Sequence, residues 1–196
     1  MVGTGADFAA VVLAAGSASR FGGGKLTAPY RGAPLLHGAL AAAKAAPAAT
    51  IIVVTGAGAE AVAACARAFD ADIRLVHAPD HAEGMGASLR AGIAALAPGV
   101  AGAFVFLGDM PRAPIGVLEP LAQAVRAGAP AAAPTFRGAR GHPVVLSAAL
   151  FPQALTLSGD VGARPLIQAL GARLALVEAP DDGVLFDVDE RGDLGR

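Results

Sequence analysis

Two cations follow the first apolar run of the chain, inside a turn that is rich in glycine. Residues 13–25 read LAAGSASRFGGGK, and Lys25 is one of only two lysines in the protein. Arg20 offers a planar fork of N–H donors and Lys25 offers a compact charge, and both suit phosphate oxygens. Gly16 and Gly22 carry no Cβ, so a phosphate can approach the backbone N–H groups around them. We therefore expect this turn to bind a polyphosphate.

The spacing of these residues excludes two common phosphate-binding loops. The Walker pattern needs Ser or Thr directly after its Lys, and here Leu26 follows Lys25. The dinucleotide fingerprint G-x-G-x-x-G also fails, because Gly56 and Gly58 are followed by Ala61 where the third glycine is needed. Neither a P-loop NTPase nor a nicotinamide or flavin dehydrogenase is expected.

Carboxylates that could hold a cation occur at two places. Asp109 stands in FVFLGDMP, directly after an apolar run. Near the end of the chain, FDVDE carries Asp187 and Asp189, which strand alternation would place on one face. Mg²⁺ prefers one or two protein carboxylates together with substrate phosphates. Asp109 could therefore either cap its turn or hold a Mg²⁺ ion, and either Asp187 or Asp189 could supply a second carboxylate.

The elements that must position these residues alternate along the chain. Expected strands, from short apolar runs that suit parallel strands buried on both faces, span 8–14, 50–56, 72–78 and 102–108. Expected helices, from patterns rich in Ala and Leu, span 34–46, 58–69, 87–97 and 114–127. This alternation predicts an α/β fold with a mostly parallel sheet between two layers of helices, a Rossmann-like α/β/α arrangement.

Beyond residue 129 the pattern changes. Two candidate strands surround the turn-rich segment FRGARGHP, which predicts a small antiparallel flap. The remaining pattern predicts helices at 148–155 and 163–170 and a strand at 172–178. We expect one domain over 1–196.

Polar clusters follow three of the expected strands. They are GSASRFGGGK after the first strand, HAPDHAEGMGAS after the third and GDMP after the fourth. In open parallel sheets, ligands bind outside the carboxyl ends of the strands. The clusters are therefore expected to form one site at that edge.

Composition narrows the possible partners and location. The net charge is −1 with no basic block, which argues against nucleic acid as a partner. No apolar run approaches the roughly 20 residues that span a bilayer, so no membrane contact is expected. The start MVGTGADFAA lacks a secretory pattern, and the single Cys65 allows no disulfide within the chain. We expect a cytoplasmic protein with Cys65 as a buried apolar side chain.

Six segments, in the same order, resemble the nucleotidyltransferases that process the molybdenum cofactor, most closely those that transfer CMP. The first is L-A-A-G-x-x-x-R-x-G-x-x-K, followed by KLTAPYRGAPLL and EGMGASLRAG. FLGDMP resembles the metal-binding strand end of that family, GHPVV with GDVGAR its acceptor side, and FDVDERGDL its ending. Glu190 and Arg191 depart from the family, in which Thr-Pro is common.

The resemblance implies Mg²⁺-dependent transfer of CMP from CTP to the phosphate of molybdopterin or the molybdenum cofactor, with release of pyrophosphate. The implied catalytic residues are Lys25, Arg20 and Asp109, and the implied metal ligands are Asp109 and Asp189. The nucleotide would be bound by Leu13, Ala14, Ala15, Gly16, Arg20, Gly22, Lys25, Thr55 and Ser88. The acceptor would be bound by His142, Arg140, Asp160 and Arg164.

Several alternatives stay open. Relatives that transfer GMP usually read L-A-G-G, so the methyl group of Ala15 favours a pyrimidine, by roughly 1–3 kcal/mol. GTP could still be the donor, or another phosphorylated molecule the acceptor. The chain could also be a non-catalytic chaperone that delivers cofactor to a client molybdoenzyme. Asp187 could support the metal site indirectly, and Ser88 could serve only to open a helix.

Overall fold

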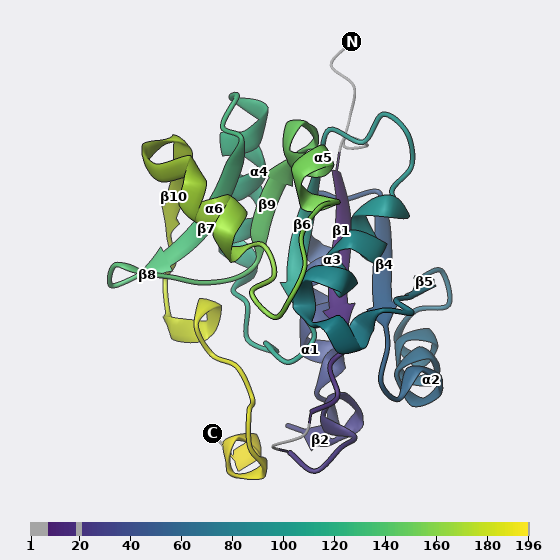
Figure 1. The fold of residues 1–196 in the computed structure, drawn as a ribbon. Helices are drawn as coiled ribbons and strands as arrows, with labels where there is room; N and C mark the ends of the chain where they lie inside the picture. The colour runs from purple at the N-terminus through teal and green to yellow at the C-terminus, as the bar shows by residue number, and fades with distance from the viewer. Residues whose placement is uncertain (1–7, 19–20, 196) are drawn as a thin grey trace.

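The protein is described by a computed structural model that covers residues 8–18 and 21–195. Within these residues the centre is an eight-stranded sheet in the order β10-β7-β9-β6-β1-β4-β5, with β8 paired to β7 (Figure 1). Its strands are β1 (Phe8–Ala14), β4 (Thr50–Thr55), β5 (Arg74–His77), β6 (Gly102–Leu107), β7 (Ala131–Phe136), β8 (Ala139–Arg140), β9 (Val144–Ser147) and β10 (Leu174–Glu178).

Most neighbouring strands of the sheet are parallel. β1 pairs in parallel with β4 and β6, β4 with β5, and β7 with β10. β9 is antiparallel to both β6 and β7. The mostly parallel sheet confirms the predicted fold class.

Helices cover both faces of the sheet because strand side chains alternate (Figure 1). Ala10 and Val12 of β1 pack in one core with α1 (Leu36–Ala45), α2 (Ala59–Phe69) and α4 (Leu118–Arg126). Val11 and Leu13 pack in the opposite core with α3 (Met85–Ala94), α5 (Phe151–Ala154) and α6 (Arg164–Leu170). The 3₁₀ helices span Lys25–Thr27, His81–Glu83, Ile115–Val117, Ala148–Leu150, Gly171–Arg173, Asp182–Val184 and Arg191–Gly195.

The predicted hairpin exists, but its strands belong to the main sheet. Thr135 pairs with Arg140 and Phe136 with Ala139 across a two-residue turn. The φ angles of the turn residues, Arg137 and Gly138, are 51° and 80°, as a type I′ turn requires. β9 then enters the sheet between β6 and β7, a position the apolar pattern alone did not predict.

Two other expectations need correction. β5 is a half-exposed edge strand, not a strand buried on both faces, and Arg74 and His77 at its ends are exposed. α3 begins at Met85, two residues before the expected start, because the chain enters it through Gly84. Cys65 is buried on α2 as expected, and burial raises the pKa of its thiol.

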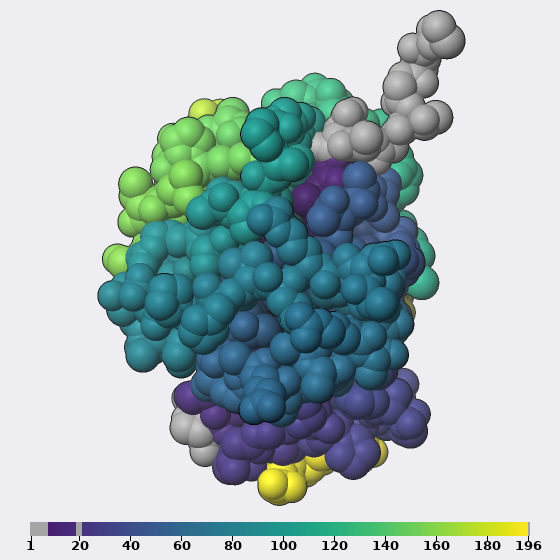
Figure 2. Space-filling view, turned by 90° about the vertical axis from the view of Figure 1, so that its right-hand side faces the viewer, coloured from purple at the N-terminus to yellow at the C-terminus, as the bar shows by residue number. Residues whose placement is uncertain are grey.

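The segment after β1 and the C-terminal tail share a small core of their own. Phe21, Tyr30, Leu35 and Val188 are its buried members. Tyr30 belongs to a two-stranded antiparallel sheet, β2 (Pro29–Tyr30) with β3 (Ala33–Pro34). Figures 1 and 2 show the yellow tail beside this purple segment at one end of the molecule. The tail is therefore brought to the end at which β1 stops.

Over the described ranges, 8–18 and 21–195, every helix is too short or too polar to cross a bilayer.

Candidate functional site

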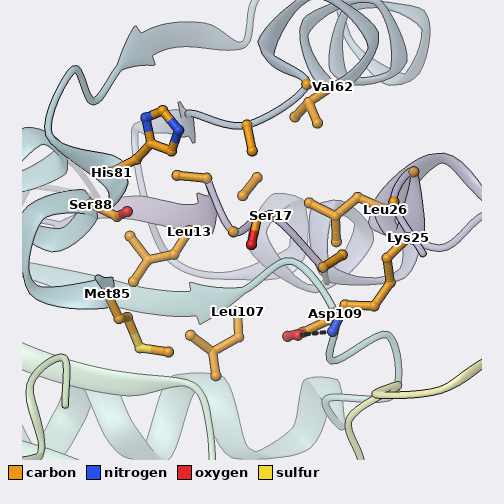
Figure 3. Close-up of a pocket in the computed structure, with 18 of the residues that line it drawn as sticks. Leu13, Ser17, Lys25, Leu26, Val62, His81, Met85, Ser88, Leu107 and Asp109 are labelled. Atoms are coloured by element: carbon orange, nitrogen blue, oxygen red, sulfur yellow. Dashed lines mark hydrogen bonds and ion pairs between the residues drawn. The ribbon is translucent and has the colours of Figure 1, made fainter. Parts of the chain in front are cut away.

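A cavity of 730 Å³ opens at the carboxyl ends of β1 and β6 (Figure 3). Residues 13–18 and 23–27 form one side of it, and residues from α2 and from the loop between β5 and α3 form another. The lining is completed by Ala57 and Gly58 before α2, Met85 and Ser88 of α3, and Leu107, Asp109 and Asp160. The polar clusters that follow β1, β5 and β6 thus meet at one edge of the sheet, which is the geometry expected from their positions in the sequence.

Backbone hydrogen bonds fix these loops to one another. The Gly108 N–H donates to Leu13 O at 2.9 Å, and the Ala57 N–H donates to Ala15 O at 3.1 Å. Gly38 of α1 packs directly on Pro111, and a Cβ at Gly38 would lie 2.5 Å from the Pro111 carbonyl oxygen. The loop after β6 that carries Asp109 is thereby held in place from both sides.

The three consecutive glycines give the turn a backbone that other residues rarely adopt. Gly22, Gly23 and Gly24 have φ angles of 86°, 89° and 64°, which L-residues with a Cβ disfavour. The Gly23 N–H donates to Ala18 O at 3.2 Å, so this N–H serves the turn itself and not a ligand. Buried Phe21 anchors the turn in the small core. The path of the glycines brings Lys25 back over the end of β1.

Lys25 is the cation at the centre of the site. Its Nζ donates to Asp109 Oδ2 at 2.7 Å and lies 3.7 Å from Asp189 Oδ1. The Lys25 side chain is 11% exposed, against 27% for Asp109 and 51% for Asp189. Figure 3 shows the Lys25–Asp109 pair beside the cavity. Residues 84 positions apart in the sequence therefore form one ion pair.

The tail carries Asp187 and Asp189 to Asp109 through the backbone. The Val188 N–H donates to Asp109 O at 3.0 Å, and Val188 is fully buried. The segment is not a strand, but the two aspartates still flank the buried Val188 and stay exposed. Partial burial of the Asp187 carboxyl raises its pKa, and the carboxylates of Asp189 and Asp109 raise that pKa further. Negative charge is concentrated at this point.

These carboxylates suit a divalent cation that is completed by substrate. In the part of the chain that the structure describes, no three His, Cys, Asp or Glu side chains are placed to hold a metal by themselves. Asp109 and Asp189 both approach one cationic group, the Lys25 ammonium. Two carboxylates plus phosphate oxygens is a ligand set that Mg²⁺ accepts, so the donors present fit that ion.

The other expected nucleotide ligands are divided between the cavity and its support. Leu13, Ala14, Ala15, Gly16 and Ser88 line the cavity with Lys25. Gly22 and Thr55 do not: Thr55 is 4% exposed and its Oγ1 donates to Val76 O at 3.4 Å within the sheet. Arg20 lies outside the described residues.

The wall opposite the glycine-rich turn combines His81, which belongs to the polar cluster expected after β5, with apolar residues that sequence patterns did not single out. His81 lines the cavity, and its Nδ1–H donates to Ala78 O at 3.0 Å. A Cβ at Gly56 would lie 2.6 Å from the His81 ring, so this approach requires glycine. Val62 and Leu26 add apolar surface. They are typical core residues by pattern, and no signal in the sequence marks them as cavity residues.

The expected acceptor residues come from several separate elements. Asp160 lines the cavity, where it packs against Gly84 at the start of α3. Arg140 lies on the exposed hairpin, and Arg164 begins α6. His142 is partly buried, and its Nδ1 atom is buried with no hydrogen-bond partner among the described residues. Burial lowers the pKa of His142, and Arg164 lowers it further against the opposing effects of a Val105 backbone hydrogen bond and Asp109.

Arg90 connects the walls from outside the cavity. Its guanidinium donates to Leu157 O at 2.6 Å and to Glu83 Oε2 at 3.2 Å. Nearby, the Gly86 N–H donates to Gly159 O at 2.9 Å. The loop that carries Asp160 is therefore tied to the loop that carries His81.

Comparisons with known proteins agree with this architecture. The chain is 36% identical over 187 residues to a protein named nicotine blue oxidoreductase from Paenarthrobacter nicotinovorans, covering 91% of this chain and 90% of that protein. Rv0371c from Mycobacterium tuberculosis superposes with a TM-score of 0.87 at 29% identity over 99% of this chain and 98% of that one. A manganese complex of Rv0371c superposes with a TM-score of 0.75 at 27% identity, covering 88% of each chain. A nucleotidyl transferase from Methanothermobacter superposes with a TM-score of 0.76 at 27% identity, covering 95% of this chain and 93% of that one.

The family match covers the elements that build the cavity. Residues 10–174 match the family described as MobA-like NTP transferase domain. That span contains the glycine-rich turn, Lys25, the loop with His81 and Asp109, while the tail with Asp189 follows it. Because the matched span covers most of the chain and every wall of the cavity, the protein belongs to the MobA-like NTP transferase family.

Proposed function

We propose that the protein transfers CMP from CTP to the terminal phosphate of molybdopterin or the molybdenum cofactor and releases pyrophosphate. The observation that carries the proposal is the Lys25–Asp109 pair, 2.7 Å long, at a cavity lined by the glycine-rich turn. A cation and a carboxylate at the carboxyl ends of neighbouring parallel strands are placed where a triphosphate and its metal are handled in such folds.

The reaction needs positioning more than acid–base chemistry. An oxygen of the acceptor phosphate attacks the α-phosphorus of the nucleotide, and the bond from that phosphorus to the bridging oxygen of the β-phosphate breaks. The acceptor phosphate is already ionised at neutral pH, so no residue has to remove a proton. Charge develops on the α-phosphate and on pyrophosphate. Lys25 stabilises the charge on the α-phosphate, and Arg20 binds the phosphates of the leaving pyrophosphate.

Asp109 and Asp189 are the proposed ligands of Mg²⁺. When bound, the ion would neutralise phosphate charge and align the triphosphate. The concentration of negative charge around Asp109 supports this assignment, because it makes a divalent cation favourable there. The manganese complex of Rv0371c supports a divalent cation as the bound metal, without identifying its ligands. Asp187 would support the site through its charge.

The cavity has an apolar side that suits a base. Ala15 is 3% exposed and lines the cavity, as do Ala57 and Gly58, and its carbonyl oxygen accepts the Ala57 N–H at 3.1 Å. Its methyl group takes space that a purine would need, which supports CTP over GTP as donor. His81 would close the base subsite.

Asp160 is the acceptor-side residue best supported by position. It lines the cavity on a loop tied to the start of α3. We assign Arg164 and Arg140 to the approach of the anionic acceptor, and His142 to the shape of the acceptor wall. Because the pKa of His142 is lowered, the imidazole ring of His142 is neutral at neutral pH.

A pyrophosphate-release assay tests the proposal. The purified protein is incubated with Mg²⁺, molybdenum cofactor and each of the four nucleoside triphosphates in turn. Release with CTP, together with a CMP-containing dinucleotide by mass spectrometry, is the expected result. Release of pyrophosphate with GTP and not with CTP would identify GTP as the donor. Release only with a different phosphorylated acceptor would identify that molecule as the acceptor substrate. Binding without release would indicate a delivery chaperone.

A second candidate rests on the relative named nicotine blue oxidoreductase, because 36% identity over nearly the whole chain is substantial. On this reading the cavity would hold a redox nucleotide in place of a triphosphate. The oxidoreductase candidate predicts that the protein oxidises NADH or NADPH in the presence of nicotine blue, whereas the nucleotidyltransferase candidate predicts no such oxidation. The absorbance of the reduced nucleotide measures this reaction. Asp109→Asn separates them further, because hydride transfer needs no metal ligand there whereas nucleotidyl transfer does.

A further inference from the structure

Lys25 already occupies the space between the two proposed metal ligands. Its Nζ lies 2.7 Å from Asp109 Oδ2 and 3.7 Å from Asp189 Oδ1. Since the Lys25 side chain is 11% exposed, water contributes little to the solvation of this ammonium group, and the carboxylates must contribute most. A cation that binds both carboxylates would come within a few ångströms of the ammonium. Two cations so close together repel strongly where water is excluded.

We propose that Lys25 is a built-in competitor of the divalent cation, so that the metal binds Asp109 and Asp189 only when the ammonium moves away. The triphosphate offers Lys25 a new anionic partner. Nucleotide and metal therefore bind cooperatively, and the protein without nucleotide holds the metal weakly. This inference deepens the proposed function and rests on it for the identity of the metal ligands.

The rest of the site allows Lys25 to change partners. Its side chain lines the cavity and begins a 3₁₀ helix, so the ammonium can turn towards the cavity without moving a core residue. Both carboxylates are held through the backbone, Asp109 by the Val188 N–H at 3.0 Å and Asp189 by its own N–H bonded to Asp193 Oδ2 at 3.1 Å. The carboxylates stay in place when Lys25 leaves.

The wild-type protein can report the exchange directly, because it contains only two lysines. In protein labelled with ¹⁵N-lysine, the ammonium signals of Lys25 and Lys44 are assigned by the Lys44→Met variant. Lys44 pairs with Asp70 on the surface and serves as the internal control. Titration with Mg²⁺ alone should shift or broaden the Lys25 signal and leave the Lys44 signal unchanged. A Lys25 signal that stays constant while Mg²⁺ binds would overturn the proposal.

Affinity for Mn²⁺ gives a second, independent measurement. Free Mn²⁺ is followed by electron paramagnetic resonance in wild type, Lys25→Met and Lys44→Met, all without nucleotide. Lys25→Met should bind Mn²⁺ on the order of tenfold more tightly, since it removes a charge within 4 Å of both carboxylates. Lys44→Met should match wild type. Equal or weaker binding by a folded Lys25→Met protein contradicts the proposal.

A nucleotide arm measures the predicted cooperativity. A CTP analogue with a methylene bridge between the α- and β-phosphates, which cannot react, should tighten Mn²⁺ binding in wild type by a larger factor than in Lys25→Met. An equal factor in both proteins contradicts the exchange of partners. None of these measurements needs an acceptor or turnover. If the metal displaces Lys25 but no nucleotidyl transfer occurs, this inference holds and the proposed function is wrong. If transfer occurs while Lys25 keeps its partners, the proposed function holds and this inference is wrong.

Discussion

Single residues carry the proposed charge chemistry, and the proposal assigns it to one of the two lysines of the chain. Lys25 is the most enclosed member of the Lys25–Asp109–Asp189 group. The pattern of the glycine-rich turn predicted a phosphate-binding role for this lysine, but not its ion pair with Asp109. That pair depends on two loops from different strands, and spacing along the chain says nothing about their distance in space.

Replacement of Lys25 tests its role in the chemical step. Lys25→Ala should lower kcat by about 10² or more, because a charge beside the transferring phosphate acts chiefly in the transition state. The KM for CTP should change much less. Steady-state kinetics of this variant, with Lys44→Ala as the matched control, measure both. Normal turnover by folded Lys25→Ala would reduce the residue to a structural cation.

Base choice is argued from one methyl group. Ala15→Gly should raise kcat/KM for GTP relative to CTP by about tenfold, within the range that one methyl group provides. Ala14→Gly is the comparison variant, because Ala14 lines the cavity but also packs in the core with α1 and α2, so its loss should affect stability more than base choice. The measurement is kcat/KM for CTP and for GTP in wild type and in both variants. A wild type that already prefers GTP contradicts the assignment of CTP.

Elements differ in how far the sequence predicts them. β1, β4 and β6 lie within one or two residues of their expected bounds, because buried parallel strands are continuous apolar runs. The half-exposed edge strand β5 and the insertion of β9 depend on tertiary neighbours, which a local pattern does not contain. Apolar wall residues such as Val62 are indistinguishable from core residues in sequence.

The C-terminal tail is the element whose role emerges only in three dimensions. Asp193 Oδ2 accepts the N–H groups of Asp189 and Glu190, at 3.1 and 2.9 Å. An aspartate on an exposed turn would be expected to tolerate replacement, yet here it holds the turn that presents Asp189. Asp193→Ala should therefore raise the Mg²⁺ concentration needed for half-maximal activity several-fold, since each lost hydrogen bond costs about 1 kcal/mol.

The comparison among aspartates makes this prediction specific. Asp109→Asn and Asp189→Asn should raise the Mg²⁺ requirement more than Asp193→Ala does, because they remove proposed ligands. Asp193→Asn, which keeps one acceptor oxygen, should be the mildest. Activity titrated against Mg²⁺ ranks the four variants. An equal loss in all of them would mean that the carboxylates act through structure alone.

At the scale of the whole molecule, partly buried His142 links stability to pH. Its pKa is lowered from 6.5 by burial, so the folded state binds this proton less readily than the unfolded state. The contribution of neutral His142 to the free energy of unfolding is therefore fully present above about pH 6.5. It is lost as the pH decreases from that value through the lower pKa of the folded state. His142→Gln, which stays neutral, should lose less thermal stability than wild type between pH 7.5 and about pH 5. Parallel loss in both proteins would assign acid sensitivity to other groups.

Transfer of a nucleotidyl group in the cavity is proposed for the whole molecule, and an experiment with a labelled nucleotide can detect it directly. CTP labelled at the α-phosphate is incubated with molybdenum cofactor, Mg²⁺ and either wild type or Asp109→Asn. We expect label in a cofactor–CMP dinucleotide with wild type, and labelling at least about 10²-fold slower with Asp109→Asn. Absence of labelled product with any of the four nucleoside triphosphates, or undiminished labelling by Asp109→Asn, would contradict it.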